Sequence, residues 1–226
     1  MIVLAVDSTA VCATAAACLF ENDRLVTYAL TTSKNGLTHS ETLLPIADGV
    51  LRLLGKRMDE VGLFAVSAGP GSFTGVRIGV SLVKGLAFAG GTPCAAVSPL
   101  EALAKAHEAF PGVVCAVMDA RRGQYYNALF QNGERLCSDR AIDTDALLAE
   151  IRAYAALLCE RARRENLRLA PESSREQNAL SVALCGYRRW SLGYAVTPDA
   201  LSPVYLRKPQ AEREREERMN KGENKE

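Results

Sequence analysis

Histidine and tryptophan are scarce in this sequence of 226 residues, which has two histidines, His39 and His107, and one tryptophan. Its seven cysteines are an odd number and include no Cys-x-x-Cys pair. This usage argues against a structural zinc site and a disulfide framework, and is typical of reduced thiols in the cytosol. No apolar run reaches the ~18 residues that span a membrane, and the first residues lack the basic flank and cleavage site of a signal peptide. We therefore expect a cytoplasmic protein without membrane contact.

An excess of one charge is also missing, since 27 lysines and arginines stand against 26 acidic residues, for a net charge of +1. This balance gives no sign of the large basic surface with which a protein binds nucleic acid on its own. Local clusters such as Arg121-Arg122 leave two interpretations open, solvated charge or a nucleic-acid contact, and the first is favoured. The apolar content of 48% is enough for a sizeable core, in one large domain or two small lobes.

Apolar runs and turn signals along the chain predict an α/β protein with two lobes. In the first part, strands are expected at 2–6, 13–20, 24–30, 63–66 and 94–97, and helices at 39–54 and from 74 onward. In the second part, the pattern predicts helices at 99–109 and 143–164, and strands at 113–118, 123–130 and 180–185. We assign residues 1–98 to the first lobe, 99–200 to the second lobe, and 201–226 to a C-terminal segment with a charged tail.

A tight glycine turn between a strand and a helix is the most informative segment. The strand at 63–66 runs into Gly69-Pro70-Gly71, and an apolar helix starts near Thr74. Such a junction directs backbone N–H groups and the positive helix end at one point, which suits a phosphate. A sharp corner needs glycine even where nothing binds, so both interpretations stay open. The spacing, with glycines at 69, 71 and 75, matches neither the dinucleotide fingerprint nor the P-loop.

Polar residues at the ends of other expected strands would complete a nucleotide cleft beside this turn. Asp7 and Asp119 each follow an apolar strand, where α/β folds hold a metal-bound nucleotide, although a carboxylate that caps a turn fits each position as well. The segment from Asp7 to Thr9 has no glycine, so its backbone cannot approach a phosphate closely. We interpret the cleft as degenerate, with these candidate residues: Asp7, Ser8, Thr9, Gly69, Gly71, Ser72 and Asp119.

The helix after the glycine turn is apolar on almost all sides, because only Arg77, Ser81 and Lys84 form a polar stripe. A helix of this kind must be covered on both sides, by the sheet and by another helix. Gly75 and Gly79 would let that second helix approach closely. The helix at 39–54 provides the cover in one interpretation, and a partner protein provides it in the other.

The stretch from Ser67 to Gly79, Ser-Ala-Gly-Pro-Gly-Ser-Phe-Thr-Gly-Val-Arg-Ile-Gly, closely resembles the signature of the TsaB (YeaZ) family. The segments 4–9, 38–45, 118–125 and 201–207 also resemble motifs of that family, and only residues 140–185 are not distinctive. Members act in bacterial synthesis of N6-threonylcarbamoyladenosine (t6A) in tRNA, with the paralogue TsaD and the ATPase TsaE.

The resemblance implies the actin-like ATPase (ASKHA, ribonuclease H-like) fold with a reduced second lobe. The catalytic paralogue TsaD carries a His-x-x-x-His metal pair, and the equivalent positions here are Pro99 and Leu103, neither of which can bind a metal. We therefore expect no metal and no catalytic residue in this chain. No cofactor is expected on the chain alone, and ATP or ADP is left open as a ligand of the complex.

The function that the resemblance implies is a non-catalytic scaffold that activates TsaD, with TsaE, for threonylcarbamoylation of adenosine 37 in tRNAs that read ANN codons. The expected partners are TsaD in a heterodimer, TsaE, a second copy in a homodimer, and tRNA indirectly through the complex. The expected interface lies on the helices at 39–54 and after residue 74, at Leu44, Ile46, Leu53, Val76, Val80 and Val83. The alternative is an active nucleotide-dependent transferase or a glycoprotease-like peptidase of the same superfamily.

Overall fold

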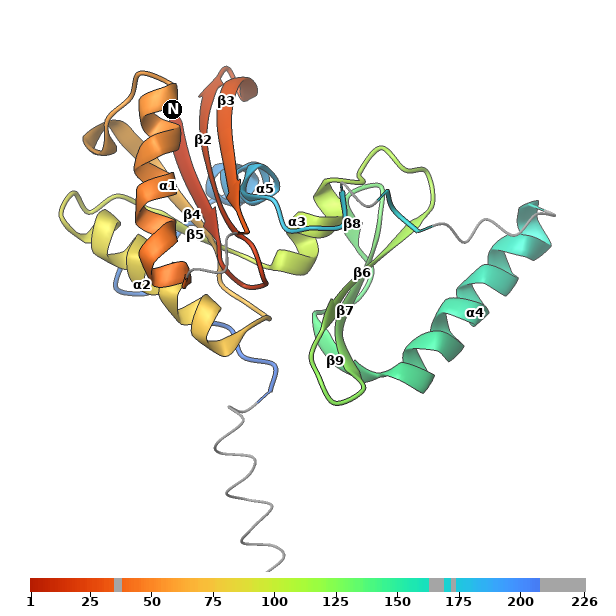
Figure 1. The fold of residues 1–226 in the computed structure, drawn as a ribbon. Coiled ribbons are helices and arrows are strands. Elements are labelled where there is room, and N and C mark those ends of the chain that lie inside the picture. The colour runs from red at the N-terminus through yellow and green to blue at the C-terminus, as the bar shows by residue number, and fades with distance from the viewer. Residues whose placement is uncertain (35–37, 163–168, 172–173, 208–226) are drawn as a thin grey trace, which may run out of the picture.

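The computed structural model describes residues 1–34, 38–162, 169–171 and 174–207 of the chain. Figure 1 shows two lobes side by side, each with its own sheet. The charged tail of the predicted segment 201–226 lies outside the described residues. Among the helices that are described, none combines the length and the apolar character needed to cross a bilayer.

The first lobe is built on a five-stranded sheet in the order β3-β2-β1-β4-β5. Its strands are β1 (Ile2–Asp7), β2 (Ala13–Glu21), β3 (Arg24–Ser33), β4 (Val61–Ser67) and β5 (Cys94–Val97). β2 pairs antiparallel with β1 and β3, whereas β1, β4 and β5 run parallel. The carboxyl ends of the parallel strands meet at one edge of the sheet, and this brings Asp7 and Ser67 together.

Helices cover both faces of this sheet (Figure 1). α1 (His39–Leu53) and α2 (Phe73–Phe88) lie on one face, over a core that includes Leu4, Val66 and Val80. α5 (Ala179–Ser191) lies on the other face, over a core that includes Val3 and Val182. These cores use alternate residues of each strand, as the pleat of a sheet buried on both faces requires.

The position of α5 corrects two predictions. The apolar run at 180–185 predicts a strand, but these residues are helical, and the side chain of Asn178 caps the helix by accepting the N–H of Leu180 at 2.8 Å. A short apolar run has the same appearance in a buried strand and a buried helix, so periodicity alone does not separate them. The assignment of 99–200 to the second lobe is also wrong in part, because α5 completes the first lobe.

The second lobe is a small sheet of β6 (Val113–Asp119), β7 (Gln124–Gln131), β8 (Glu134–Arg135) and β9 (Arg140–Asp143). β7 pairs antiparallel with each of the other three. α3 (Pro99–Lys105) contributes Leu100 and Ala104 to the core of this lobe, and α4 (Thr144–Ala162) follows β9. The predicted two-lobed α/β architecture with a reduced second lobe is confirmed.

Residues 201–207, called the C-terminal strap, run from the first lobe to the second. Leu201 is buried in the core beneath α2, and the N–H of Val204 donates to the carbonyl of Ala68 at 2.7 Å. At the end of the strap, Arg207 Nη1 donates to the carbonyl of Ala120 at 2.5 Å. The strap therefore ties the glycine turn of the first lobe to the β6–β7 turn of the second.

Candidate functional site

The carboxylate of Asp7 lies at the end of β1 and is fully buried. Its Oδ1 accepts the N–H and the hydroxyl of Thr9 at 2.8 and 2.7 Å, and its Oδ2 accepts the hydroxyl of Ser67 at 2.5 Å. Burial raises the pKa of Asp7 above its ordinary value, although the hydrogen bonds from Ser67 and Thr9 oppose the change. Both carboxylate oxygens are therefore occupied from within the chain. Sequence analysis did not single out Ser67 as a partner, although its place at the end of the neighbouring parallel strand signals it.

The glycine turn packs against the segment that follows β1. The N–H of Ser72 donates to the carbonyl of Thr9 at 2.8 Å, and the hydroxyl of Ser8 donates to the carbonyl of Gly75 at 2.8 Å. A Cβ at Gly75 would overlap the carbonyl of Ser8, and a Cβ at Gly71 would lie 2.7 Å from the Cβ of Thr9. Glycine is needed here because two loops of the same chain approach each other closely.

The opposite side of the turn is covered by the C-terminal strap. Gly69 has a φ of +114°, a conformation that side chains rarely adopt, and a Cβ there would overlap the carbonyl of Val204. The strap was grouped with the charged tail in the sequence analysis. Its Pro203-Val204-Tyr205 run is not charged, and this was the available signal that it packs on the lobe.

A nucleotide phosphate, which the actin-like fold implies, does not fit this turn. The N–H of Ser72 already donates to Thr9, and the N–H of Gly75 donates to the hydroxyl of Ser72 at 3.3 Å. Asp119 lies on the second lobe, is exposed, and accepts the N–H of Arg121 at 2.6 Å, as a turn carboxylate does. The candidate residues of the first lobe are thus brought together, but they bind one another.

The positions equivalent to the histidine pair of TsaD hold packing residues. Pro99 is buried in the first turn of α3, and Leu103 packs against the core of the second lobe. His39 and His107 each contact a backbone carbonyl through Nε2, at 2.8 and 3.1 Å. Within the described part of the chain, no group of three or more His, Cys, Asp or Glu side chains is placed to hold a metal.

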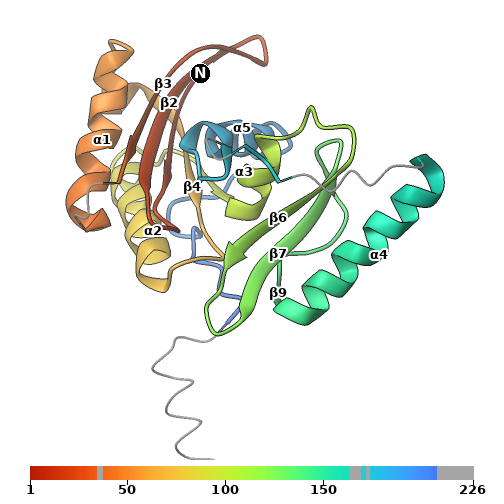
Figure 2. The same cartoon turned by 45° about the vertical axis from the view of Figure 1, so that its right-hand side comes forward.

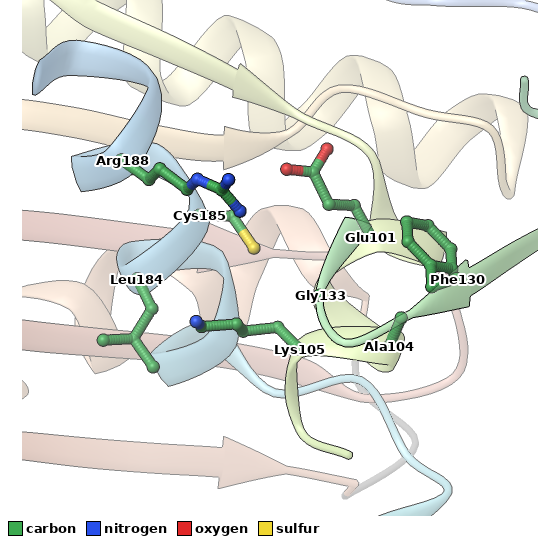
Figure 3. Close-up of a pocket in the computed structure, with 8 residues that line it drawn as sticks. All are labelled: Glu101, Ala104, Lys105, Phe130, Gly133, Leu184, Cys185 and Arg188. Carbon is green, nitrogen blue, oxygen red and sulfur yellow. The ribbon is translucent and has the colours of Figure 1, made fainter. Parts of the chain in front are cut away.

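A small cavity lies between α3, α5 and the β7–β8 hairpin (Figure 3). Ion pairs surround it, since Arg189 contacts Glu101 at 2.6 Å and Arg188 contacts Glu134 at 3.0 Å. Burial raises the pKa of the Cys185 thiol in its wall to about 12, so this thiol stays protonated and unreactive. The cavity has room for about one water molecule. It is a junction between the lobes and not a substrate site.

The predicted interface residues fall into two groups. Leu44 and Leu53 are 45% and 74% exposed on α1, and Ile46 lines a groove between α1 and β3. Val76, Val80 and Val83 are each 2% exposed or less, because α2 turns this side to the core, so the prediction that they contact a partner is wrong. The space beside Gly75 and Gly79 is likewise taken by Ser8 and not by a second helix.

Phe88 is an exposed apolar residue that sequence analysis did not place at the surface. It is 68% exposed at the end of α2. It continues the stripe of Arg77, Ser81 and Lys84 at helical spacing, since it lies eleven residues after Arg77. That register was the signal that it faces outward.

The fold and the filled turn together define an actin-like ATPase fold whose phosphate-binding position is occupied by the chain itself. A family model described as tRNA N6-adenosine threonylcarbamoyltransferase (TsaD) matches residues 33–179. The tRNA threonylcarbamoyladenosine biosynthesis protein TsaB of Bacillus subtilis is 35% identical over 150 residues, which are 66% of this chain and 64% of that protein. TsaB of Escherichia coli is 37% identical over 98 residues, or 42% of each chain.

The solved structure of YeaZ from Pseudomonas aeruginosa is also similar, with a TM-score of 0.69, 25% identity, and coverage of 91% of this chain and 99% of that one. The chain belongs to the TsaB (YeaZ) family. The aligned regions span less than two thirds of the two curated TsaB proteins, 64% and 42%.

Proposed function

We propose that this chain is a non-catalytic subunit that supports TsaD, with TsaE, in forming t6A at adenosine 37 of tRNA. The observation that carries the proposal is the state of Asp7, whose two carboxylate oxygens are both bound by Thr9 and Ser67 in a fully buried site. The relatives' names supply the pathway, and the filled turn argues against catalysis by this chain. ATP or ADP in the complex is then held outside this turn.

The outer sides of α1 and α2 are the proposed contact with TsaD. Leu44, Leu53 and Phe88 are large apolar side chains that stay 45%, 74% and 68% exposed, and a groove beside Ile46 continues the surface toward β3. A paralogue with the same fold would offer an equivalent pair of helices, so the two chains would meet about a pseudo-twofold axis. The same geometry permits a homodimer when TsaD is absent. Buried thiols such as Cys18, whose pKa burial raises to about 12, suit a reducing cytoplasm.

The test is reconstitution of t6A formation on an unmodified tRNA transcript with purified components of the pathway. The chain alone is expected to form no t6A and to hydrolyse no ATP, and its addition to TsaD and TsaE is expected to restore modification. Asp7→Asn preserves the shape of the buried site, so this variant should restore modification as the wild type does. Turnover by the isolated chain that Asp7→Asn abolishes would establish the alternative, an active transferase or peptidase.

A further inference from the structure

Cationic and aromatic side chains gather where the C-terminal strap passes between the lobes. They are Phe73, Arg77, Arg121, Tyr205 and Arg207, and together they are called the cationic–aromatic patch. The guanidinium of Arg77 lies 3.9 Å from the ring centroid of Phe73, and its Nε donates to the hydroxyl of Tyr205 at 3.0 Å. The rings of Phe73 and Tyr205 lie 5.0 Å apart. The first lobe thus contributes a stacked cation beside two rings.

The second lobe contributes the β6–β7 turn. Arg207 Nη1 donates to the carbonyl of Ala120 at 2.5 Å, which holds the strap against this turn. Figure 2 shows the turn and the strap close together at the same end of the molecule. Arg121 has a φ of +62° and its neighbour a φ of +56°, which is uncommon for residues other than glycine. The turn therefore holds an exposed arginine beside the strap.

The arginines of the patch have no ion-pair partner within the described part of the chain. Across the described ranges, no carboxylate forms an ion pair with Arg77, Arg121 or Arg207. Asp119 is in the same turn, but it accepts the backbone N–H of Arg121. A chain with a net charge of only +1 thus places three arginines, none of them ion-paired to a described carboxylate, along the strap and the β6–β7 turn. Tyr205 beside them is 41% exposed.

We propose that the cationic–aromatic patch binds RNA directly, with Arg77 and Arg121 on backbone phosphates and Tyr205 stacked on an unpaired base. Ring faces and guanidinium planes are the groups that hold unpaired nucleotides, whereas an acidic protein segment would engage the charges and leave the rings unused. The inference rests on the proposed function for the choice of tRNA. It adds a direct contact where the sequence analysis expects an indirect one. Arg77 and Phe88 lie on the same outer side of α2, Arg77 toward its start and Phe88 at its end. A contact with TsaD centred on Phe88 therefore leaves the patch accessible.

The test measures binding of the full chain to a fluorescent, unmodified tRNA transcript by anisotropy over a range of salt concentrations. The variant Arg77→Gln/Arg121→Gln should weaken binding about tenfold near 0.1 M salt and reduce the slope of log K against log salt by about 1.5 to 2. The matched control, Arg24→Gln/Arg57→Gln, removes the same charge from exposed arginines elsewhere on the first lobe. It should bind as the wild type does. Tyr205→Ala should weaken binding several-fold with an unchanged slope, and Tyr205→Phe should not.

The proposal is overturned if the two double variants weaken tRNA binding equally, or if neither weakens it. Loss of TsaD co-elution in the Arg77→Gln/Arg121→Gln variant, or equal competition by polyglutamate and by tRNA, would make the patch a protein contact and also overturn the proposal. The t6A reconstitution is read separately. If wild-type chain binds tRNA through the patch but does not restore t6A, the proposed function fails and the RNA site stands. If the wild-type chain restores t6A but the patch variants bind tRNA as the wild type does, the RNA site fails and the proposed function stands.

Discussion

At the scale of single residues, Asp7 distinguishes this chain from an active nucleotide-binding protein. A carboxylate at the end of the first strand would need an oxygen that is open to the cleft to bind a metal ion or its water ligands. Here Thr9 and Ser67 use both oxygens, and the residue is fully buried. The side chain therefore closes the strand end as a structural element. For that reason, Asp7→Asn and Asp7→Ala should change the stability of the protein differently.

Asp7→Ala should lower the free energy of unfolding by about 1–3 kcal/mol, because the N–H of Thr9 loses its buried partner. Asp7→Asn keeps the oxygen that Thr9 uses and removes a buried ionisable group, so its stability at pH 7 should equal or exceed that of the wild type. Urea denaturation of the three proteins measures both differences.

The difference in stability between the wild type and Asp7→Asn should also change with pH in one direction. The pKa of Asp7 is raised in the folded state, so the folded protein takes up the proton more readily than the unfolded chain. The stability of the wild type relative to Asp7→Asn should therefore increase as pH falls from the raised pKa toward the ordinary value of 3.8, and stay constant above that window. A difference that decreases on acidification would contradict the burial argument.

At the scale of elements, the glycines of α2 have different roles. Gly75 touches the carbonyl of Ser8, whereas Gly85, on the same helix, has nothing within 4 Å of the position of a Cβ. The first is needed for the contact between the glycine turn and the segment after β1. The second is a weak point in a helix, where alanine is favoured over glycine.

Gly75→Ala should therefore destabilise the protein by about 2–3 kcal/mol or more through overpacking, since the opposing atom is backbone and cannot move aside. Gly85→Ala, the same change on the same helix, should stabilise it by about 0.5–1 kcal/mol. Chemical denaturation of both variants checks the pair. Similar effects of the two substitutions would show that the close approach at Gly75 is not needed.

The elements with local signals could be predicted from the sequence. The Thr38–Glu41 capping box marks the start of α1, and the Gly69-Pro70-Gly71 turn marks the junction of β4 and α2. The exposure of each α2 residue could not be predicted, because a helix that is apolar on nearly all sides does not show which apolar side faces the sheet. Val76 and Phe88 were misjudged for this reason. The packing of Val204 on Gly69 depends on residues 135 positions apart, which no local pattern reports.

At the scale of the whole molecule, the sheet of the first lobe separates the exposed apolar side chains of α1 from those near α5. Leu44 and Leu53 project from α1, and α5 covers the opposite face of the sheet. A charge placed on α1 should therefore affect association without entering the core. This separation permits a test of the interface that leaves the fold intact.

Leu53→Glu should abolish co-elution with TsaD in gel filtration and reduce t6A formation in proportion, because it places a charge within an apolar contact. Leu192→Glu, at a residue 61% exposed next to α5, is the control and should change neither. Both variants should unfold at the wild-type denaturant concentration. Normal co-elution of Leu53→Glu would move the interface away from α1. Should the homodimer alone be lost, this face would serve self-association and not TsaD.

The return of α5 to the first sheet has a consequence for how the protein is made. The five strands of that sheet are complete once residue 97 has been synthesised, but the layer over Val3 and Ala65 comes from residues 179–191. A nascent chain therefore carries one uncovered apolar sheet face while almost a hundred further residues are translated. The amino-terminal lobe, usually the first to fold during synthesis, must here wait until α5 has emerged from the ribosome.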